Sequence, residues 1–422
     1  MTKMFRTVFV AAAVSLLLCT SVGATTLVVA THINDAELVG SQVELMKGFE
    51  QLYPGVEVEI WYSPWADYHD RLLTMYLGGA GPDVATVGRL QFASFIEGGL
   101  FQSLNQFIAA DPRLDINKDA VSGIMFSGIY KGEVYGFPVY NGPALLFYNP
   151  TIFAQRGVAE PVDYVASDNW NRETFLQVAK KLTYDTAGRG TPTHFGYFGY
   201  TEWQPMWISY IRHAGGDAIT SDRSGLNLPQ TIESLEWLND LNVLHGVTAH
   251  PGPGGASWES GTIAMHIRWQ TTGLIEKNLY AAVDPEPAPI PAGPKGYAHL
   301  VGGVPACVAT SAENPELAYQ YAKWFGMESE IWKLRGGPPL SWKQVRGPEY
   351  RATLRAFKNP TMFDMALVGD ARPEPEFGFV EYAEINNILA NVLINPIRRG
   401  EVSVRAAVSE AHRLLTQVLE KR

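Results

Sequence analysis

Short apolar runs that alternate with amphipathic helical segments constrain the fold of this chain more than any other feature. Residues 27–30 are wholly apolar, which is typical of a strand buried on both faces of a parallel sheet. In residues 34–53, apolar side chains recur at steps of three and four and predict a helix that ends at Pro54-Gly55. Residues 56–60 then alternate Val and Ile with Glu, the period of a strand. This order predicts an α/β fold with a parallel sheet.

The same alternation continues and indicates where a ligand would bind. A second helix, with Tyr68 and Leu72 on one side, stops at Gly78-Gly79 before an apolar strand over residues 84–87. In parallel α/β sheets ligands bind beyond the carboxyl ends of the strands, so the residues after each strand are the informative ones. These residues lie in three segments, namely His32 to Asp35, Ser63 to Trp65 and Gly88 to Gln91.

Helical periodicity predicts the elements of the second half of the chain. Residues 231–245 place three leucines on one face of a helix. The chain ends on a clean amphipathic helix that Ser403 caps. The inward side of this last helix is predicted to consist of Val404, Val408, Ala411, Leu415 and Val418.

The first 24 residues predict a cleaved signal peptide. Lys3 and Arg6 precede an apolar run, and Val22-Gly23-Ala24 is a small-residue cleavage site. We expect the mature chain to begin near Thr25 and to be exported to the periplasm. Leu18 is a poor residue to precede a lipidated cysteine, so we expect no lipid anchor at Cys19. No later stretch reaches the ~20 apolar residues that a membrane-spanning helix needs.

Composition excludes several classes of protein. The chain has a net charge of −10, or −12 without the leader, which contains two basic and no acidic residues. Such a charge disfavours binding to nucleic acid or to an anionic membrane. After cleavage Cys307 is the only cysteine, which excludes disulfides and cysteine metal clusters, and we interpret it as a core residue. The chain has 11 Trp, a number that also suits the apolar faces of sugar rings.

A series of short motifs in a fixed order resembles the family 1 extracellular solute-binding proteins of ABC importers. The sharpest piece runs from Tyr130 through Tyr135-Gly136 and Pro138 to Tyr148-Asn149 and Gly157. The other pieces, from the N-terminal to the C-terminal end, are Gly81-Pro82-Asp83-Val84, Trp170 with Phe175, Trp258 to Met265, Pro289-Ile290-Pro291, Gly302-Gly303, Asn314 to Ala318 and Gly400-Glu401-Val402. The resemblance runs nearly from end to end.

The resemblance implies a two-lobed periplasmic binding protein fold of type II, with lobes hinged by chain crossings. The first lobe would comprise residues 25–139 and 307–359, and the second residues 142–303 and 360–422. The hinges would lie near 138–142 and 301–306, where glycine or proline would permit an abrupt change of sheet. The resemblance further implies a monomer that captures a carbohydrate, delivers it to the permease of an ABC importer, catalyses nothing and needs no cofactor or metal.

A pyranose ring presents an apolar C–H face and a rim of hydroxyls, so its site combines aromatic rings with planar polar groups. The family often has a ligand-facing tryptophan at the position of Trp269. Trp203 and Trp207, with Gln204 between them, resemble the aromatic segment of the second lobe, and we expect at least one to face the ligand and the other to pack. Tyr140 and Asn141 lie at the first crossing.

The first lobe contributes the remaining candidates by the strand-end rule and by the family's use of the same loops. These are His32, Asn34, Asp35, Trp65, Arg89 and Gln91. Two have structural alternatives, since Asn34 could only cap its helix and Arg89 could pair with a surface carboxylate. The maltose-binding members have an acidic residue beside an arginine after the third strand, whereas this chain has Arg89-Leu90-Gln91, which leaves the sugar open. Four further tryptophans are predicted to be core residues, namely Trp170, Trp237, Trp258 and Trp324.

The sequence leaves two alternatives to a carbohydrate-binding protein. The first is a secreted carbohydrate-active enzyme, although the chain has no Gly-x-Ser-x-Gly, no phosphate loop and no His-Glu-x-x-His. The second is a binding protein for polyamine, iron or an organic phosphate. Iron would need clustered tyrosines or histidines, and the acidic net charge disfavours an anion.

Overall fold

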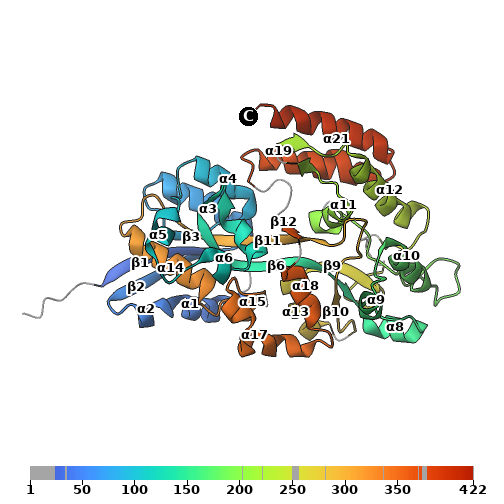
Figure 1. Cartoon of the computed structure of the whole chain (residues 1–422), viewed down its shortest axis with the longest axis horizontal. Coiled ribbons are helices and arrows are strands. Elements are labelled where there is room, and N and C mark those ends of the chain that lie inside the picture. Colours follow the sequence, from blue (N-terminus) through green and yellow to red (C-terminus); the bar gives the residue numbers. More distant parts are fainter. Residues whose placement is uncertain are drawn as a thin grey trace, which may run out of the picture.

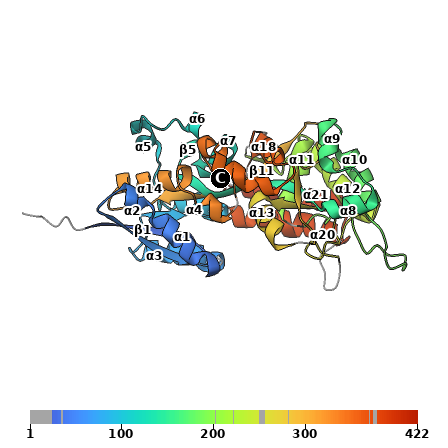
Figure 2. The same cartoon turned by 90° about the horizontal axis from the view of Figure 1, so that it is seen from below.

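The structure is a computed structural model that describes residues 24–33, 36–201, 203–220, 222–249, 256–280, 282–335, 337–368, 370–372 and 378–421. Its elements form two lobes joined by strands that both lobes share (Figure 1). Seen from below, α1–α3 again lie at one end of the molecule and α8–α10 at the other (Figure 2). Within these residues, no helix is both long and apolar enough to span a bilayer.

One mixed sheet runs through both lobes in the order β10-β6-β11-β3-β1-β2, with β9 also paired to β6 and β12 to β11. Its strands are β1 (Thr25–His32), β2 (Val56–Ser63), β3 (Val84–Thr86), β6 (Gly136–Tyr148), β9 (Met265–Trp269), β10 (Glu286–Ala288), β11 (Ala298–Val308) and β12 (Asp370–Arg372). β1 is parallel to both β2 and β3, as the apolar runs predict. β6 is antiparallel to β9, β10 and β11.

Helices on both faces of β1–β3 build the first lobe. They are α1 (Val39–Lys47), α2 (Phe49–Leu52), α3 (Trp65–Leu77), α4 (Arg89–Glu97) and α14 (Pro315–Met327). Neighbouring residues of β1 point to opposite faces of the sheet. Val29 packs with α1, α2 and α14, whereas Ala30 packs with α3 and α4. Short helices follow at α5 (Asn105–Ala110), α6 (Ile116–Asp119), α7 (Ser122–Met125), α15 (Trp332–Arg335), α16 (Trp342–Val345) and α17 (Pro348–Thr353).

The second lobe is built around the far halves of β6 and β11. Its helices are α8 (Pro150–Arg156), α9 (Pro161–Ala166), α10 (Arg172–Lys181), α11 (Ile208–His213), α12 (Pro229–Val243), α13 (Gln270–Leu279), α18 (Thr361–Val368), α19 (Tyr382–Asn387), α20 (Asn395–Arg398) and α21 (Val404–Leu419). A π-helical segment over Ile388–Ile394 joins α19 to α20. α21 packs beside α12, so the end of the chain closes this lobe (Figure 1).

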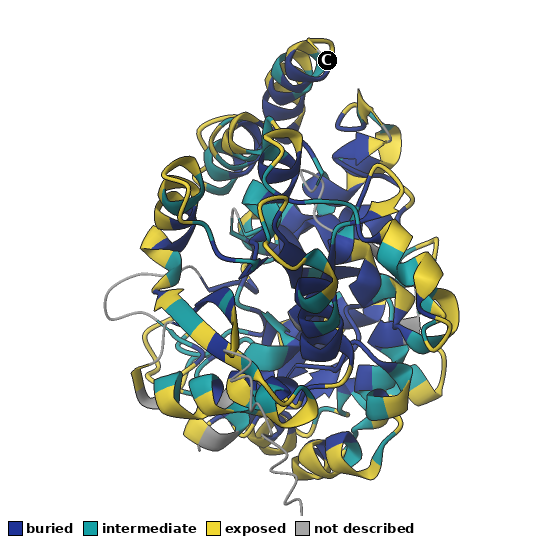
Figure 3. Ribbon diagram, turned by 90° about the vertical axis from the view of Figure 1, so that its left-hand side faces the viewer, coloured by how far each residue is buried: buried dark blue, intermediate teal, exposed yellow. Residues whose placement is uncertain are grey.

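The two faces of the sheet differ in how their cores are divided. On one face, Phe137 and Phe147 of β6 belong to a single core that continues through both lobes. On the other face the cores are separate, one with Ala30 and Tyr68 in the first lobe and one with Leu146 in the second. In Figure 3, buried residues gather at the centre of the ribbon and exposed ones face outward.

Several sequence predictions are confirmed and two need correction. The five inward residues of α21 are all buried, and the Ser403 hydroxyl accepts the Ala406 N–H at its start. Cys307 is fully buried. The single helix predicted over 34–53 is wrong, because it is broken at Gly48 into α1 and α2. The expected abrupt change of sheet is also absent, because β6 and β11 cross as continuous strands with one irregularity between Val304 and Pro305.

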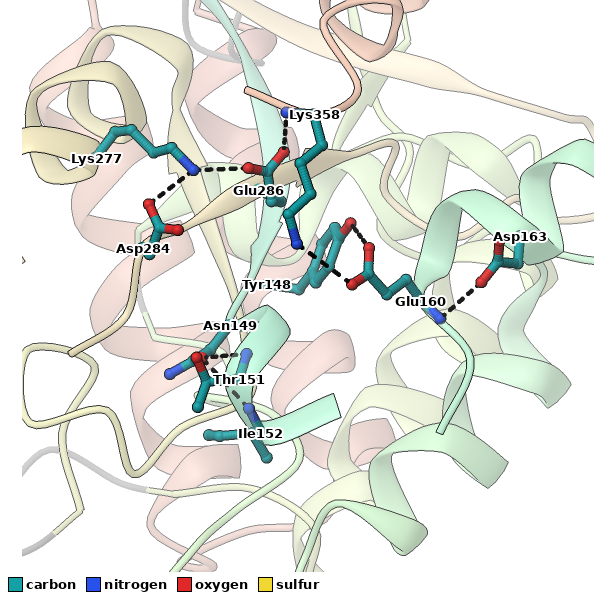
Figure 4. A network of polar contacts seen from close by, with 10 residues as sticks. All are labelled: Tyr148, Asn149, Thr151, Ile152, Glu160, Asp163, Lys277, Asp284, Glu286 and Lys358. Atoms are coloured by element: carbon teal, nitrogen blue, oxygen red, sulfur yellow. Dashed lines mark hydrogen bonds and ion pairs between the residues drawn. The ribbon is translucent and has the colours of Figure 1, made fainter. Parts of the chain in front are cut away.

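A buried polar network fixes the edge strand β10 in the second lobe (Figure 4). The Glu286 carboxylate, which is fully buried, pairs with Lys277 Nζ of α13 at 2.6 Å. Its second oxygen accepts the backbone N–H of Lys358 at 2.9 Å. Lys277 also reaches Asp284 at 2.8 Å. Every oxygen of the buried carboxylate therefore has a partner, as a buried charge requires.

The packing of α14 on β6 leaves no space for a side chain at Gly326. A Cβ there would lie 2.6 Å from the Phe137 Cβ and 3.1 Å from its carbonyl oxygen. We predict that Gly326→Ala lowers the free energy of unfolding by ~1 to 3 kcal/mol, because overpacking outweighs the gain in helix propensity. The matched control is Gly40→Ala in α1, where an added Cβ would have nothing within 4 Å, and it should stabilise slightly. Urea unfolding of both variants tests this, and equal effects would contradict the close packing.

Candidate functional site

The carboxyl ends of β1 and β2 place a cluster of aromatic rings at the side of the first lobe that faces the second. His32 ends β1 and is buried, and its ring lies 4.6 Å from the ring of Trp65 at an interplanar angle of 78°. Trp65 is half-buried and begins α3, and its ring lies 4.7 Å from that of His69. The strand-end prediction thus brings His32 and Trp65 together.

Gly88 permits this cluster to close against the end of β3. A Cβ on Gly88 would lie 2.6 Å from the Trp65 ring and 2.8 Å from His69. The Gly88 N–H donates to His69 Nε2 at 2.8 Å. Burial lowers the pKa of His69 to about 4, so the imidazole is neutral at pH 7 and its proton resides on Nδ1. Only glycine therefore fits between the strand end and these two rings.

α4 begins directly after Gly88 and carries Arg89 and Gln91, both half-buried. Gln91 Nε2 donates to the hydroxyl of Tyr382 at 3.3 Å. Tyr382 is the first residue of α19, so this hydrogen bond joins the two lobes across 291 residues of sequence. Gln91 Oε1 is buried and has no hydrogen-bond partner among the described residues.

The second lobe contributes a pair of tryptophans. Trp269 ends β9, and Trp203 directly precedes the short helical turn over Gln204–Met206. Their rings meet edge to face, with centroids 5.7 Å apart at 81°, and both side chains are half-buried. By the alternation of β9, Trp269 lies on the same face of the sheet as Met265 and Ile267. Those two side chains belong to the core of the second lobe, on the face where the two cores are separate. Both tryptophans are therefore on the face of the sheet where the cores of the two lobes are separate.

Trp269 also lies directly over the crossing strands. Its backbone pairs with Ala144 of β6. A Cβ on Gly302 of β11 would lie 3.2 Å from the edge of the Trp269 ring, so glycine at this position lets the indole lie close to the strand. Trp269 is thereby placed beside the chain segments that connect the lobes.

The other predicted residues of the second lobe have different environments. Trp207 is fully buried in the core, whereas Gln204 is buried with its Nε2 3.5 Å from Asn386 Oδ1 of α19. Of the two tryptophans that the sequence could not distinguish, Trp207 packs and Trp203 is half-exposed.

Four predicted site residues are not placed in full. Asn34 and Asp35 lie outside the described residues. Tyr140 and Asn141 are paired in β6 with Val304 and Gly303, but their side chains are also outside what the structure describes.

The prediction of four core tryptophans is confirmed for three of them. Trp170, Trp258 and Trp324 are buried. Trp237 is half-buried, with the Arg172 guanidinium 5.1 Å from its ring centroid.

Sequence reasoning missed three residues that contact the predicted ones. His69 follows Trp65 by four residues in α3, a spacing that places both on one side of a helix and could have indicated it. Tyr382 and Asn386 share one side of α19 for the same reason, but no local signal connects this helix with Gln91 or Gln204. The packing of α19 against α4 brings Tyr382 to Gln91.

The predicted site side chains that the structure describes are aromatic rings, amides and one guanidinium. Such groups bind by stacking and hydrogen bonding. Among the described residues, no group of three His, Cys, Asp or Glu side chains could hold a metal ion. A pocket of about 940 Å³ lies elsewhere, on the first lobe, and no predicted site residue lines it.

Two α/β lobes that share crossing strands define the class of two-lobed binding proteins. The chain belongs to the bacterial extracellular solute-binding protein family, whose model matches residues 36–327. Among its relatives, the arabinooligosaccharide-binding protein of Halalkalibacterium halodurans is 25% identical over 311 residues, which cover 68% of this chain and 65% of that protein.

Solved structures share the fold over nearly the whole chain. The sugar-binding protein MalE of Xanthomonas citri matches with a TM-score of 0.79 at 18% identity, covering 94% of this chain and 98% of that one. The cyclic α-maltosyl-1,6-maltose binding protein of Arthrobacter globiformis matches with a TM-score of 0.76 at 20% identity, covering 95% and 100%. The predicted two-lobed fold is confirmed.

The neutral state of His69 predicts a pH dependence of stability. The folded pKa of about 4 is below the ordinary value of 6.5, so between these pH values the unfolded chain binds a proton that the folded protein does not. The free energy of unfolding should therefore fall as pH falls through this range, by roughly 3 kcal/mol at ~1.4 kcal/mol per pKa unit. The amide oxygen of His69→Gln can accept the Gly88 N–H, and this side chain does not titrate. The loss of unfolding free energy that His69 causes at low pH should therefore be absent in this variant. Urea unfolding at several pH values measures the free energy of unfolding of the wild type and the variant. Parallel pH profiles of the two proteins would contradict the assigned role of His69.

Proposed function

We propose that this protein captures a carbohydrate between its two lobes and delivers it to the permease of an ABC importer. The observation that carries the proposal is the edge-to-face pair of half-buried tryptophans, Trp203 and Trp269, on the face of the sheet where the lobes can separate. An indole in this state offers a ring face to the C–H side of a sugar. His32, Trp65 and Gln91 stand on the first lobe at the ends of the neighbouring strands.

The chemistry of these groups favours a sugar over the alternative solutes. Each sugar hydroxyl donates and accepts, and an amide such as that of Gln91 or Gln204 does the same. A polyamine would call for several carboxylates and an organic phosphate for several cations. Of the predicted residues whose side chains are described, none has a carboxylate, and Arg89 alone has a guanidinium or ammonium group. The names of the relatives and solved structures, which include arabinooligosaccharide, MalE and maltosyl-maltose binding proteins, support the same class.

We further propose the division of the chain into lobes that the sequence indicates, with hinges near 138–142 and 301–306. The crossing strands β6 and β11 pair throughout this region, and the irregularity between Val304 and Pro305 lies within it. A small change of twist along two paired strands can rotate one lobe against the other. Capture of a ligand that contacts both lobes would then favour the closed arrangement.

Export and the absence of catalysis also belong to the proposal. The leader would be cleaved before Thr25, and the mature monomer would act in the periplasm. Intact mass of the protein from the native cell envelope tests cleavage, and a diacylated Cys19 would contradict it. Incubation with oligosaccharides and chromatography of the products tests catalysis, since cleaved products would favour the alternative of a secreted carbohydrate-active enzyme. Mass spectrometry of a ligand that co-purifies with the native protein would identify the sugar.

Trp269→Ala tests the binding role most simply. If Trp269 is a stacking platform, its truncation should weaken carbohydrate binding by ~2 kcal/mol or more, roughly thirtyfold, with a much smaller loss of stability. Calorimetric titration with the co-purified sugar measures the affinity, and urea unfolding measures the stability. A strongly destabilised variant with unchanged affinity would remove Trp269 from the site.

Trp237→Ala is the matched control for this experiment. Trp237 is also half-buried at the edge of the core of the second lobe, but it lies on α12 against Arg172. We expect this variant to lose stability and to retain the affinity of the wild type. An equal loss of affinity in both variants would show that Trp269 acts through folding alone.

Tyr382→Phe tests the contact between the lobes. The variant removes the hydroxyl that accepts the Gln91 amide and retains the ring. Because one neutral hydrogen bond contributes ~1 kcal/mol, carbohydrate affinity should fall by about fivefold if this bond forms on closure. Stopped-flow fluorescence should place the loss in the dissociation rate. Unchanged rates would show that the bond contributes nothing to closure.

A further inference from the structure

The two crossing strands meet at a pair of glycines. Gly142 of β6 and Gly302 of β11 are direct partners in the antiparallel ladder, so side chains at these two positions would lie on the same face of the sheet. Neither glycine has a φ in the left-handed region, so the backbone does not require glycine at either position. Glycine inside a strand weakens it and often marks a place where another group approaches closely. The reason for this pair must therefore lie in what packs against it.

The groups that pack on the pair are Trp269 and the residue after it. A Cβ on Gly302 would lie 3.2, 3.4 and 3.6 Å from three carbons of the six-membered ring of the Trp269 indole. A Cβ on Gly142 would lie 3.3 Å from the Cβ of Gln270. The shortest of these distances is below the ~3.5 to 4.0 Å at which two carbon atoms attract each other best. The two glycines thus leave room for two consecutive residues of one segment.

This segment is where the chain passes from one face of the sheet to the other. Before it, Met265 and Ile267 of β9 pack in the core of the second lobe. After it, Gly273 of α13 lies against the ring of Phe147, which belongs to the core that continues through both lobes. In Figure 1, α13 lies on the same side of β6 as α17, and α11 lies on the opposite side. Trp269 is therefore the last residue before the crossing.

Contacts on both sides of the crossing restrain the indole of Trp269. On its own face of the sheet, the ring meets that of Trp203 edge to face, with centroids 5.7 Å apart. Beyond the crossing, Gln270 Nε2 donates to the hydroxyl of Tyr350 at 2.6 Å, and both of these residues are buried. A methyl group added to Gly302 would therefore push the indole against Trp203 and against an anchored neighbour.

We propose that Gly302 is a positioning residue of the interlobe site. Its missing side chain lets Trp269 rest on β11 at the depth at which the indole stacks on a sugar ring. A larger residue at this position would lift the indole from the strand and narrow the space left for the sugar. The inference rests on the proposed capture of a carbohydrate between the lobes and deepens it, because Gly302 acts on the sugar only through Trp269.

Gly302→Ala tests the seat of the indole without any ligand. Each of the 11 tryptophans has one indole N–H, and the variant Trp269→Phe assigns the signal of Trp269 in a ¹H–¹⁵N TROSY spectrum. We expect Gly302→Ala to shift this signal and to leave those of the core tryptophans Trp170 and Trp324 unchanged. The midpoint of urea unfolding should change little, because alanine strengthens a strand that glycine weakens.

Calorimetric titration of the same variant tests the consequence for binding. Maltotriose, arabinotriose and the sugar that co-purifies with the native protein are the probes. Each probe that the wild type binds should bind Gly302→Ala about tenfold more weakly, since overpacking displaces the stacking ring. A loss of affinity without a loss of stability is not expected of a merely structural glycine.

Trp269→Phe completes a double-mutant cycle that separates the ring contact from an effect on the strand. The phenyl ring can still stack, and its smaller size should leave room for a methyl group at residue 302. In this background Gly302→Ala should therefore weaken binding by less than about twofold. If Gly302→Ala alone does not fold, Trp269→Phe should restore its folding for the same reason, and failure to do so would overturn the contact.

Gly142→Ala is the matched control. It adds a methyl group at the directly paired position, but there the new Cβ would meet Gln270 and not the indole. Its effect on affinity should be equal with Trp269 and in the Trp269→Phe background.

Three results would overturn the positioning role of Gly302. They are an unmoved Trp269 signal in Gly302→Ala, an unchanged affinity, and an equal loss of affinity in the Trp269→Phe background. A wild type that binds none of the probes would contradict the proposed function instead. The Trp269 signal would then still decide whether Gly302 seats the indole.

Discussion

The antiparallel pairing of β6 with β11 is the interaction on which the rest of the structure depends. The pairing runs from Gly136 and Cys307 in the first lobe to Pro143 and Val301 in the second, without a change of sheet. β3 joins the first lobe to β11, and β9 and β10 join the second lobe to β6. The register of two strands thereby determines how far the strand ends of the first lobe lie from Trp269 in the second.

The cores are divided differently on the two faces of this sheet. On one face a continuous core, with Phe137 and Phe147 on β6, holds both lobes to the crossing strands. On the other face the cores are separate, so the proposed motion of the lobes would expose no packed apolar interface there. The tryptophan pair of the second lobe lies on that divided face. The proposed binding between the lobes and the proposed motion of the lobes thus depend on the same packing.

Local sequence pattern predicts where the candidate residues at the strand ends lie. His32, Trp65 and Gln91 follow apolar runs directly, and strand order alone places them at one edge of the sheet. The partner of Gln91 could not be predicted, because Tyr382 approaches it through the packing of α19 on α4 and not through any local pattern. Trp203 could not be distinguished from Trp207 for a related reason. Both are large and apolar, and tertiary contacts decide that Trp207 is buried and Trp203 only partly buried.

Small-angle X-ray scattering tests most directly the central claim that a carbohydrate is bound between two movable lobes. The mature protein is measured without ligand and again at saturation with the sugar that co-purifies with it. We expect a smaller radius of gyration at saturation, because a ligand that contacts both lobes shifts the population towards the closed arrangement. Calorimetry on the same samples establishes occupancy. An unchanged scattering curve at full occupancy would contradict closure of the lobes on the ligand.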